Sequence, residues 1–398
     1  MGDVLVSVQQ QEEPALVTSS DLLHLQILGV EFVVRWGSGV SREQQLNMRA
    51  AWARCASEQV PGAAVPSPPA ASEAFAVSVA YQSRQQETDE FELGASSFEE
   101  LAENLTSRLT VTAILANAGQ LTMLHACGIA DPETGATVAL VAKSGTGKTT
   151  AASVLAKTYG YVTDETVAIR HDRTVMPYPK PLSVKLRHGR PKKQVGPDAL
   201  GLRLAPPNPF LQSIVLLNRV SGEGRTPPAL ERVPLPEALL ALIPDSSSQG
   251  ELQQPLQSLC RLIDSVGGVW EVTYSEATDL PAVLAPLFQE QPRLEPRWEP
   301  RDSGSAEPGE VREGYIQRTP AKDAIAIGSE LLVMVDAGIV DLAGIGPAIW
   351  EAAAEPLTPG QLAEKVAKVH GTPEGYRAAV EQAVELLAAE GVLEQGRC

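Results

Sequence analysis

Residues that can bind phosphate are concentrated in one segment, 142–149, which reads Ala-Lys-Ser-Gly-Thr-Gly-Lys-Thr. This segment matches the phosphate-binding P-loop pattern G-x-x-x-x-G-K-[ST] at every position except the first, where alanine replaces glycine. Gly145 and Gly147 stand where such a loop turns tightly and brings its amide N–H groups close to phosphate oxygens. An apolar run at 138–141 precedes the segment and a helix-favouring run at 149–157 follows it. The pattern therefore predicts a nucleotide phosphate at the N-terminus of a helix.

Two side chains of this motif have defined tasks in phosphate chemistry. Lys148 would contact the β- and γ-phosphates of ATP, and the hydroxyl of Thr149 would bind Mg²⁺. The residues expected to bind the nucleotide are Ser144, Gly145, Thr146, Gly147, Lys148, Thr149 and Thr150. A coincidental glycine-rich turn with an exposed lysine is the alternative, and the flanking strand and helix argue against it.

A pair of adjacent acids, Asp164 and Glu165, follows in the largely apolar segment 161–169. We interpret this segment as a strand, with Gly160 before it as the C-cap of the P-loop helix. Carboxylates are costly to bury unless they are paired or bind a metal, so the pair predicts a Mg²⁺ ligand and a catalytic base. A solvated turn between two short strands is the alternative.

One histidine and one cysteine, His125 and Cys127, lie on a strand predicted at 121–130, directly before the P-loop strand. A turn at 131–135 connects the two strands. A lone histidine in a strand is usually packed or hydrogen-bonded, and a functional role is the less common alternative. Cys127 is expected to be buried and unreactive.

A basic stretch lies between Tyr178 and Arg203, where Asp198 is the single acid. Its cationic residues are Lys180, Lys185, Arg187, Arg190, Lys192, Lys193 and Arg203. Such a local positive surface in an acidic protein could clamp a triphosphate or attract an acidic partner. A solvated loop is the equally weighted alternative.

Composition narrows the class of protein. The chain has 398 residues, 43% of them hydrophobic, and a formal net charge of −17. This length predicts two or three domains, and the negative charge argues against general affinity for nucleic acid or anionic membranes. The sequence shows no signal peptide, no apolar run of membrane-spanning length and no C-x-x-C pair. We therefore expect a cytoplasmic protein with reduced thiols at Cys55, Cys127, Cys260 and Cys398.

Residues 1–96 carry the least information. Strands are predicted within 23–36 and a helix at 47–58. We expect this region, whose role stays unknown, to pack on the nucleotide-binding domain. A helix that begins at Ser97, with Glu100 completing a capping box, is placed at the start of that domain.

Downstream patterns complete the domain plan. Further elements of the nucleotide-binding domain are predicted as strands at 210–217 and 268–274 and as helices at 235–242, 252–266 and 280–287. The region after them contains several prolines and mixed charges, which is typical of a linker. The predicted boundaries are 97–288 for the nucleotide-binding domain, 289–313 for the linker and 314–398 for a C-terminal domain.

The C-terminal domain is predicted as a β-hairpin followed by three helices. Its turn is Asp336-Ala337-Gly338, and the first helix carries Ile349 and Trp350. A second helix starts at Thr358 with Pro359 and Gln361, and a third starts at Thr372-Pro373 and ends before Gly391. This order predicts a small α+β winged-helix-like domain, and the lack of basic base-reading residues argues against DNA binding.

Three elements in order resemble the HPr kinase/phosphorylase-like family over about residues 97–290: His125-Ala126-Cys127-Gly128, the P-loop and Asp164-Glu165. The resemblance implies an α/β P-loop kinase-like domain with a mixed sheet that uses ATP and Mg²⁺. It implies that Asp164 is the base for an attacking hydroxyl, that His125 assists it, and that Glu165 and Thr149 bind Mg²⁺. We do not expect HPr itself as the substrate, because the downstream segment that engages it is not recognisable here.

Residues 314–396 resemble the PqqD-like family of peptide-recognition modules. The resemblance is carried by the hairpin around Asp336, by Ile349-Trp350, by the helix start at Leu357-Thr358 and by the helix end at Gly391. It implies binding of the leader peptide of a ribosomally made, modified peptide by strand addition to an exposed sheet edge. A dimerising or regulatory winged helix is the alternative.

Together these features predict an ATP-dependent kinase that phosphorylates a serine or threonine of a peptide or protein recruited by the C-terminal domain. Lys148, Asp164 and His125 are the expected catalytic residues. The expected partners are a nucleotide and a peptide or protein, without nucleic acid or membrane, and formation of a homo-oligomer is left open. Two other functions stay open: a nucleotide-binding regulatory protein without phosphoryl transfer, and a small-molecule kinase whose C-terminal domain dimerises.

Overall fold

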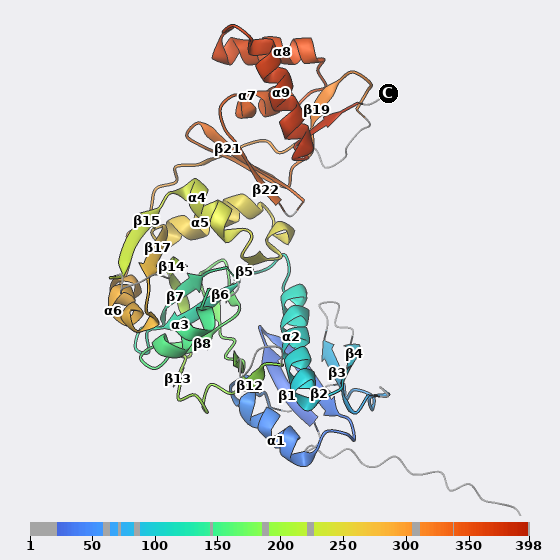
Figure 1. Ribbon diagram of the computed structural model, residues 1–398, viewed down its shortest axis with the longest axis vertical. Coiled ribbons are helices and arrows are strands. Elements are labelled where there is room, and N and C mark those ends of the chain that lie inside the picture. The colour runs from blue at the N-terminus through green and yellow to red at the C-terminus, as the bar shows by residue number, and fades with distance from the viewer. Residues whose placement is uncertain are drawn as a thin grey trace, which may run out of the picture.

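The computed structural model describes residues 22–58, 64–70, 73–82, 88–143, 146–184, 191–220, 227–304, 311–336 and 338–396. We call its three parts the N-terminal layer (22–116), the P-loop unit (117–288) and the C-terminal unit (299–396). The N-terminal layer and the C-terminal unit lie at opposite ends of the molecule, with the P-loop unit between them (Figure 1).

The N-terminal layer is an antiparallel four-stranded sheet with two helices. Its elements are β1 (Leu22–Ile27), β2 (Val30–Trp36), α1 (Arg42–Ala51), β3 (Phe75–Gln82), β4 (Thr88–Ala95) and α2 (Phe98–Ala116). The hairpin of β1 and β2 confirms the strands predicted within 23–36. The helix predicted at 47–58 is wrong in both bounds, because a capping box of Ser41 and Gln44 starts α1 earlier and the chain leaves the helix at the buried Trp52.

Helix α2 packs within the N-terminal layer, although the predicted boundary at residue 97 assigns it to the next domain. Its side chains that share a core with β1, β2 and β3 include Leu101, Leu105 and Leu109. Met123 and Tyr178 of the P-loop unit enter the same core, so the two parts are in contact. The Ser97 hydroxyl accepts the Glu100 amide as predicted, but the Glu100 carboxylate binds Ser96, so the predicted capping box is only half formed.

The P-loop unit is built on a mixed seven-stranded sheet with the order β13-β8-β6-β7-β14-β17-β15. These strands are β6 (Ala126–Ala130), β7 (Ala136–Val141), β8 (Gly160–Thr163), β13 (Arg203–Leu204), β14 (Phe210–Arg219), β15 (Ala229–Val233) and β17 (Val269–Tyr274). β7, β14 and β17 run parallel, whereas β6 runs antiparallel to β7 and β8. The predicted mixed α/β class is confirmed, and the P-loop follows the central strand β7.

Helices cover both faces of this sheet. They are α4 (Leu235–Leu242) and α5 (Pro255–Ser265) on one face, and α3 (Lys148–Leu155) and α6 (Leu280–Leu284) on the other. Alternate residues of β7 enter the two cores: Ala139 and Val141 face α4 and α5, while Val138 and Leu140 face α3. Burial on both faces explains why residues 138–141 of β7 form an apolar run.

Two predicted strands are each split in two. Segment 121–130 forms β5 (Thr122–Leu124) and β6 with His125 between them, and segment 161–169 forms β8 and β9 (Val167–Ile169) around the acidic pair. β5 and β9 leave the large sheet and join a small antiparallel sheet of order β10-β9-β5-β16, whose other strands are β10 (Val175–Met176) and β16 (Ser246–Ser247). The candidate site residues therefore lie where the chain passes from one sheet to the other.

Gly160 does not cap the P-loop helix as predicted. Helix α3 ends at Leu155 with Ala156 as its C-cap, two residues earlier than the predicted 149–157, and Gly160 is the first residue of β8. A Cβ on Gly160 would lie 2.6 Å from the carbonyl oxygen of Leu204 in β13. Close strand packing therefore accounts for this glycine.

Most other elements of the P-loop unit confirm the predictions. β14, α4 and β17 match the predicted 210–217, 235–242 and 268–274 to within two residues at each end. α5 is shorter than 252–266, and the predicted helix at 280–287 is divided into α6 and a 3-10 helix. A separate hairpin, β11 (Leu182–Val184) and β12 (Lys193–Val195), was not predicted. In the part of the chain that the structure describes, no helix combines the length and apolarity needed to cross a bilayer.

The C-terminal unit combines a four-stranded sheet and a two-stranded sheet with three helices. Its elements are β18 (Glu299–Pro300), β19 (Ile316–Arg318), β20 (Asp323–Ile327), β21 (Glu330–Val335), β22 (Gly338–Leu342), α7 (Gly346–Ala352), α8 (Pro359–His370), α9 (Tyr376–Ala389) and β23 (Leu393–Gln395). The predicted hairpin is confirmed by β21 and β22, although Ala337 of its turn lies outside the described residues. The capping box of Thr358 and Gln361 is also confirmed. The third helix starts later than the predicted Thr372, after the left-handed Gly375.

The segment predicted as a linker, 289–313, is in its described part bound to the rest of the protein. Trp298 Nε1 donates to the carboxylate of Asp264 at 2.8 Å, and the Leu294 amide donates to the carbonyl oxygen of the same residue at 3.0 Å. β18 adds a strand to the C-terminal sheet by pairing with β20. The proline-rich composition correctly indicates little regular structure, but it gives no information about contacts.

The C-terminal sheet packs directly on α5. The side chains that it buries in the core of α4 and α5 are Ile325, Leu332 and Met334. Asp323 is 3% exposed and accepts the backbone N–H groups of Leu256 and Gln257, each at 2.9 Å. A carboxylate at a helix N-terminus is favourable, so this contact connects the C-terminal unit to the P-loop unit.

Candidate active site

The loop after β7 closes on the first residue of α3. Gly147, the N-cap of this helix, has a φ of 102°, in the left-handed region that favours glycine. The Thr146 hydroxyl donates to the carbonyl oxygen of Lys143 at 2.6 Å. Lys148 is 8% exposed and its Nζ donates to the carbonyl oxygen of Ala142. Lys148 therefore folds back across the loop, from where it can reach a phosphate held there.

Of the remaining predicted nucleotide-binding residues, the structure describes Thr149 and Thr150. Ser144 and Gly145 lie outside the described residues, whereas Thr149 and Thr150 belong to the first turn of α3. Thr150 is exposed. The Thr149 hydroxyl donates to Asp164 Oδ2 at 3.4 Å. This contact joins the P-loop to the predicted base.

The acidic pair occupies the turn between β8 and β9. The Thr163 hydroxyl oxygen accepts the amides of Glu165 at 3.2 Å and of Thr166 at 3.3 Å, and so holds the turn. Asp164 is 6% exposed, and its Oδ1 accepts the Tyr161 hydroxyl at 3.0 Å. The location is the turn between two short strands that we considered as the alternative, but the turn is not solvated at Asp164.

A lysine of the basic stretch, Lys180, forms ion pairs with both acids. Its Nζ lies 3.1 Å from Asp164 Oδ1 and 3.0 Å from Glu165 Oε2, and it donates to the carbonyl oxygen of Pro181 at 3.1 Å. Lys180 is only 2% exposed. Burial by itself would lower the pKa of Lys180, but the charges of Asp164 and Glu165 outweigh it and raise this pKa above its ordinary value. Lys180 therefore compensates the cost of placing two carboxylates in this turn.

Two interpretations of the basic stretch were open, an anion-attracting surface and a solvated loop. Neither fits Lys180, because this side chain is buried and paired with two acids distant in sequence. Lys185, Arg187 and Arg190 lie outside the described residues. Lys192 pairs with Glu103 of α2 at 3.5 Å. Lys193 and Arg203 are exposed.

His125 lies at the break between β5 and β6, and its backbone N–H donates to the carbonyl oxygen of Asp245 at 2.7 Å. Burial first, and then the charge of Lys148, lower the pKa of His125, while Glu165, Asp245 and Asp164 oppose this shift. The imidazole is therefore neutral near pH 7, the form that can accept a proton. These interactions group His125 with Lys148 and the acidic pair.

Asp245 is a site residue that sequence patterns do not predict. It precedes β16, and pairing of β16 with β5 brings it to His125. Burial lowers the pKa of Lys148, and the charge of Asp245 is the largest opposing influence. No motif surrounds Asp245 in the sequence, so a long-range strand pairing is the only indication of its position.

Arg219 and Tyr274 are two further neighbours of the P-loop that were not predicted. They are the last residues of the parallel strands β14 and β17 and pair with each other in register. A Cβ placed on Gly147 would lie 3.8 Å from Arg219 Nη1 and 3.9 Å from the Tyr274 hydroxyl oxygen. One sequence signal was available, since polar residues at the carboxyl ends of strands in α/β sheets commonly face the ligand.

The donors at the P-loop fit a magnesium–nucleotide complex in part. Mg²⁺ prefers oxygen donors and usually takes one or two carboxylates together with phosphate oxygens and water. The Thr149 hydroxyl and Asp164 Oδ2 are adjacent oxygens of this kind, and Lys180 pairs with the other oxygen of Asp164 and with Glu165. Among the described residues, no group of three or more His, Cys, Asp or Glu side chains could hold a metal ion. A cation here would therefore need phosphate oxygens of the nucleotide to complete its coordination.

The described cysteines are not candidates for chemistry. Cys55, Cys127 and Cys260 are free and buried. Burial raises the pKa of Cys55 to about 12 and raises the pKa of Cys127 and Cys260 as well, so these residues stay as thiols. The expectation that Cys127 is buried is confirmed, and Cys398 lies outside the described residues.

Comparison with known proteins adds little to this geometry. The sequence matches no protein-family model, and it matches no curated protein. Among solved structures, the chain is similar to the Hpr(Ser) kinase/phosphatase from Coxiella burnetii, with 12% sequence identity over 42% of this chain and 92% of that chain and a TM-score of 0.22. A TM-score this low does not support a conclusion about fold or function, so the functional argument depends on the site itself.

Proposed function

We propose that this protein is an ATP-dependent kinase that transfers the γ-phosphoryl group to a serine or threonine hydroxyl of a peptide or protein. The observation that carries the proposal is the contact of Thr149, in the P-loop, with the buried carboxylate of Asp164. A phosphate-binding loop and a carboxylate next to it, at the end of the central strand β7, are the parts that phosphoryl transfer requires.

In this proposal the side chains divide the work between the phosphates and the acceptor. Lys148 and the loop amides bind the phosphates, and Arg219 is near enough to the loop to assist. The oxygen of the acceptor hydroxyl bonds to the γ-phosphorus while Asp164 takes the hydroxyl proton. The bond between the γ-phosphorus and the bridging oxygen breaks, and that oxygen leaves with ADP. The neutral imidazole of His125 is available as a second proton acceptor. Mg²⁺, held by Thr149 and Asp164, would supply charge neutralisation on the phosphates when bound.

The C-terminal unit favours a peptide acceptor. Its sheet has the order β18-β20-β21-β22, so among the described strands β22 pairs with β21 alone. The free side of an edge strand offers unpaired backbone groups to an extended segment, such as the leader region of a precursor peptide. We propose that this edge recruits the substrate and that the unit acts as a PqqD-like module.

One observation favours a second function, that of a nucleotide-binding switch without phosphoryl transfer. Lys180 pairs with both Asp164 and Glu165, so neither carboxylate is uncompensated. A carboxylate that stays paired in this way accepts a proton poorly. The protein would then bind the nucleotide complex without transferring its phosphate. The two functions differ in a measurable product.

The test is transfer of labelled γ-phosphate from ATP with Mg²⁺ to a precursor-like peptide. We compare the wild type with Lys148→Ala, Asp164→Asn and, as a matched control, Lys157→Ala, which removes an exposed lysine just after α3. The kinase function predicts labelled peptide with the wild type and the control only, and nucleotide binding by Asp164→Asn without transfer. Nucleotide binding that depends on Lys148, with no labelled peptide from any variant, would instead establish the switch.

A further inference from the structure

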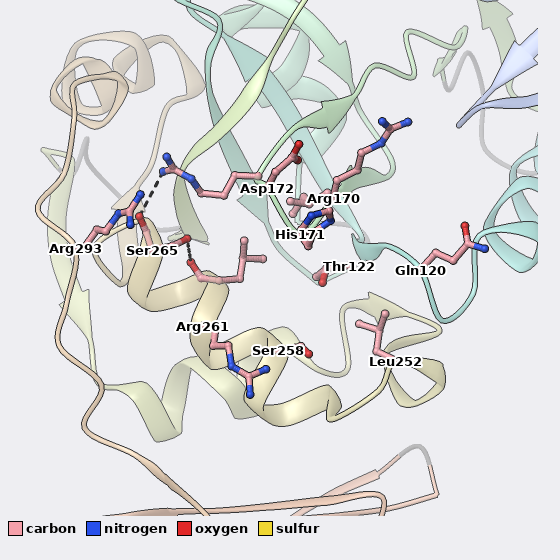
Figure 2. Close-up of a pocket in the computed structure, with 13 residues that line it drawn as sticks. Gln120, Thr122, Arg170, His171, Asp172, Leu252, Ser258, Arg261, Ser265 and Arg293 are labelled. Atoms are coloured by element: carbon pink, nitrogen blue, oxygen red, sulfur yellow. Dashed lines mark hydrogen bonds between the residues drawn. The ribbon is translucent and has the colours of Figure 1, made fainter.

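We propose that a pocket away from the P-loop binds a small organic molecule with two anionic groups. The pocket lies between α5 and the turn 170–173, which connects β9 to β10, and has a volume of about 440 Å³ (Figure 2). This inference does not depend on the kinase function, because it uses none of the residues placed at the P-loop.

The charge of the pocket is opposite to that of the protein. Its charged and titratable lining residues are Arg170, His171, Asp172, Arg173, Arg261 and Arg293. Among the described residues, none of these four arginines forms an ion pair with a carboxylate. The single acid, Asp172, accepts the backbone N–H of Thr174 at 2.9 Å within its own turn. Arg261 Nη2 donates only to neutral groups, Gln254 Oε1 and Gln257 Oε1, each at 3.1 Å. In a chain with a net charge of −17, this group of guanidinium groups without a carboxylate partner is a local site for anions.

Three of the four arginines lie at two places along α5, whereas Arg170 is directed away from this helix and its Nη2 donates to Met176 Sδ at 3.8 Å. Arg173 Nη1 donates to the carbonyl oxygen of Ser265 at 3.4 Å, and Figure 2 shows Arg293 beside Ser265. Arg261, which precedes Ser265 by four residues, projects from α5 near Ser258. Four residues of an α-helix span about 6 Å.

Apolar side chains also contribute to the lining of the pocket. They belong to Ile169, Leu252 and Leu262. Cations at two places in a pocket that also has apolar side chains suit a molecule whose two carboxylates or phosphates are separated by a short carbon or phosphate chain. A single small anion would leave one end of the pocket unused.

The small sheet separates this pocket from the candidate active site. β5 leads from Thr122 in the pocket to His125, and β9 leads from the acidic pair to Ile169 in the pocket. Three residues of a strand span about 10 Å. The pocket is therefore a second site, and its ligand does not compete with the nucleotide for the same side chains.

The experiment is calorimetric titration of the full chain carrying Lys148→Ala, so that the P-loop contributes little to binding of phosphates. Citrate is the carboxylate probe and inorganic tripolyphosphate is the phosphate probe; which of them binds more tightly identifies the chemical source of the ligand. We expect saturable binding of at least one probe at one site, weakened by added salt. Removing one charge-assisted contact, by Arg261→Gln or Arg293→Gln, should weaken this binding about tenfold. The control Arg297→Gln, an exposed arginine of the same segment as Arg293 but outside the pocket, should change it less than about twofold.

A second measurement covers the case in which a variant folds poorly. Hydrogen exchange of the unsubstituted chain should slow at 169–174 and 258–265 when the tighter probe is added. Absence of binding by both probes, equal binding by the Arg293→Gln and Arg297→Gln variants, or binding without this protection would overturn the proposal. ATP binding by chains with an intact Lys148 should be the same with and without Arg293→Gln, so the test can fail without affecting the kinase proposal.

Discussion

Replacing Lys180 with methionine would leave two carboxylates without the cation between them. Lys180 is 2% exposed, with its Nζ 3.1 Å from Asp164 and 3.0 Å from Glu165. Removing one partner of a buried ion pair typically costs about 3–5 kcal/mol. We expect the lower end, about 3 kcal/mol, because Asp164 keeps the Tyr161 hydroxyl as a donor and the Glu165 side chain is 33% exposed and can be hydrated.

The assay is urea unfolding of the full chain, followed by circular dichroism, in two backgrounds. Lys180→Met in the wild-type background should lower the free energy of unfolding by the amount above. In a chain that also carries Asp164→Asn and Glu165→Gln, Lys180 is itself a buried charge without a charged partner, so the same change should cost nothing or should stabilise the fold. Equal costs in the two backgrounds, or no cost in the wild type, would show that the charge pairing is not what holds this turn.

Three further predictions concern the same framework. Burial and Lys148 lower the pKa of His125, so the unfolded chain binds this proton at a higher pH than the folded chain. The contribution of His125 to stability is therefore present above about pH 6.5 and lost as the pH falls. The difference between the urea midpoints at about pH 7 and about pH 5 should be smaller in His125→Asn, and an unchanged difference would contradict the assignment. Gly147→Ala should lower the free energy of unfolding in urea by about 1–2 kcal/mol through the left-handed φ alone, since the nearest atom lies 3.8 Å from the added Cβ and no clash contributes. A neutral result would contradict the loop conformation. Asp323→Ala should cost about 2 kcal/mol and speed hydrogen exchange in the first turn of α5, whereas unchanged exchange would show that Asp323 does not cap this helix.

Local patterns allowed several parts of this protein to be predicted. The spacing of Gly147, Lys148 and Thr149 predicts a loop between strand and helix because its geometry depends on neighbours in the chain. The start of α8 at Thr358 and Gln361 is predicted for the same reason, since both hydrogen bonds of the capping box form within one turn. The apolar run of β7 likewise reports burial on both faces.

Contacts between distant segments account for what was not predicted. Whether 121–130 and 161–169 form one strand or two depends on pairing with β16 and β10, and no pattern inside either segment records that pairing. Asp245 reaches His125 through the same long-range pairing. The linker assignment was incomplete because the composition around Trp298 does not reveal its contact with Asp264.

The sequence by itself determined that a phosphate-binding loop lies between a strand and a helix and that an acidic pair follows it, because both depend on residues adjacent in the chain. Only the tertiary structure decided the environment of the acidic pair. Lys180 belongs to a stretch whose composition suits a solvated surface, and it becomes a buried partner of Asp164 and Glu165 because the fold brings them within 3.1 Å. Burial and charge pairing are properties of the assembled fold, so the chemistry of these carboxylates could not be derived from their position in the sequence.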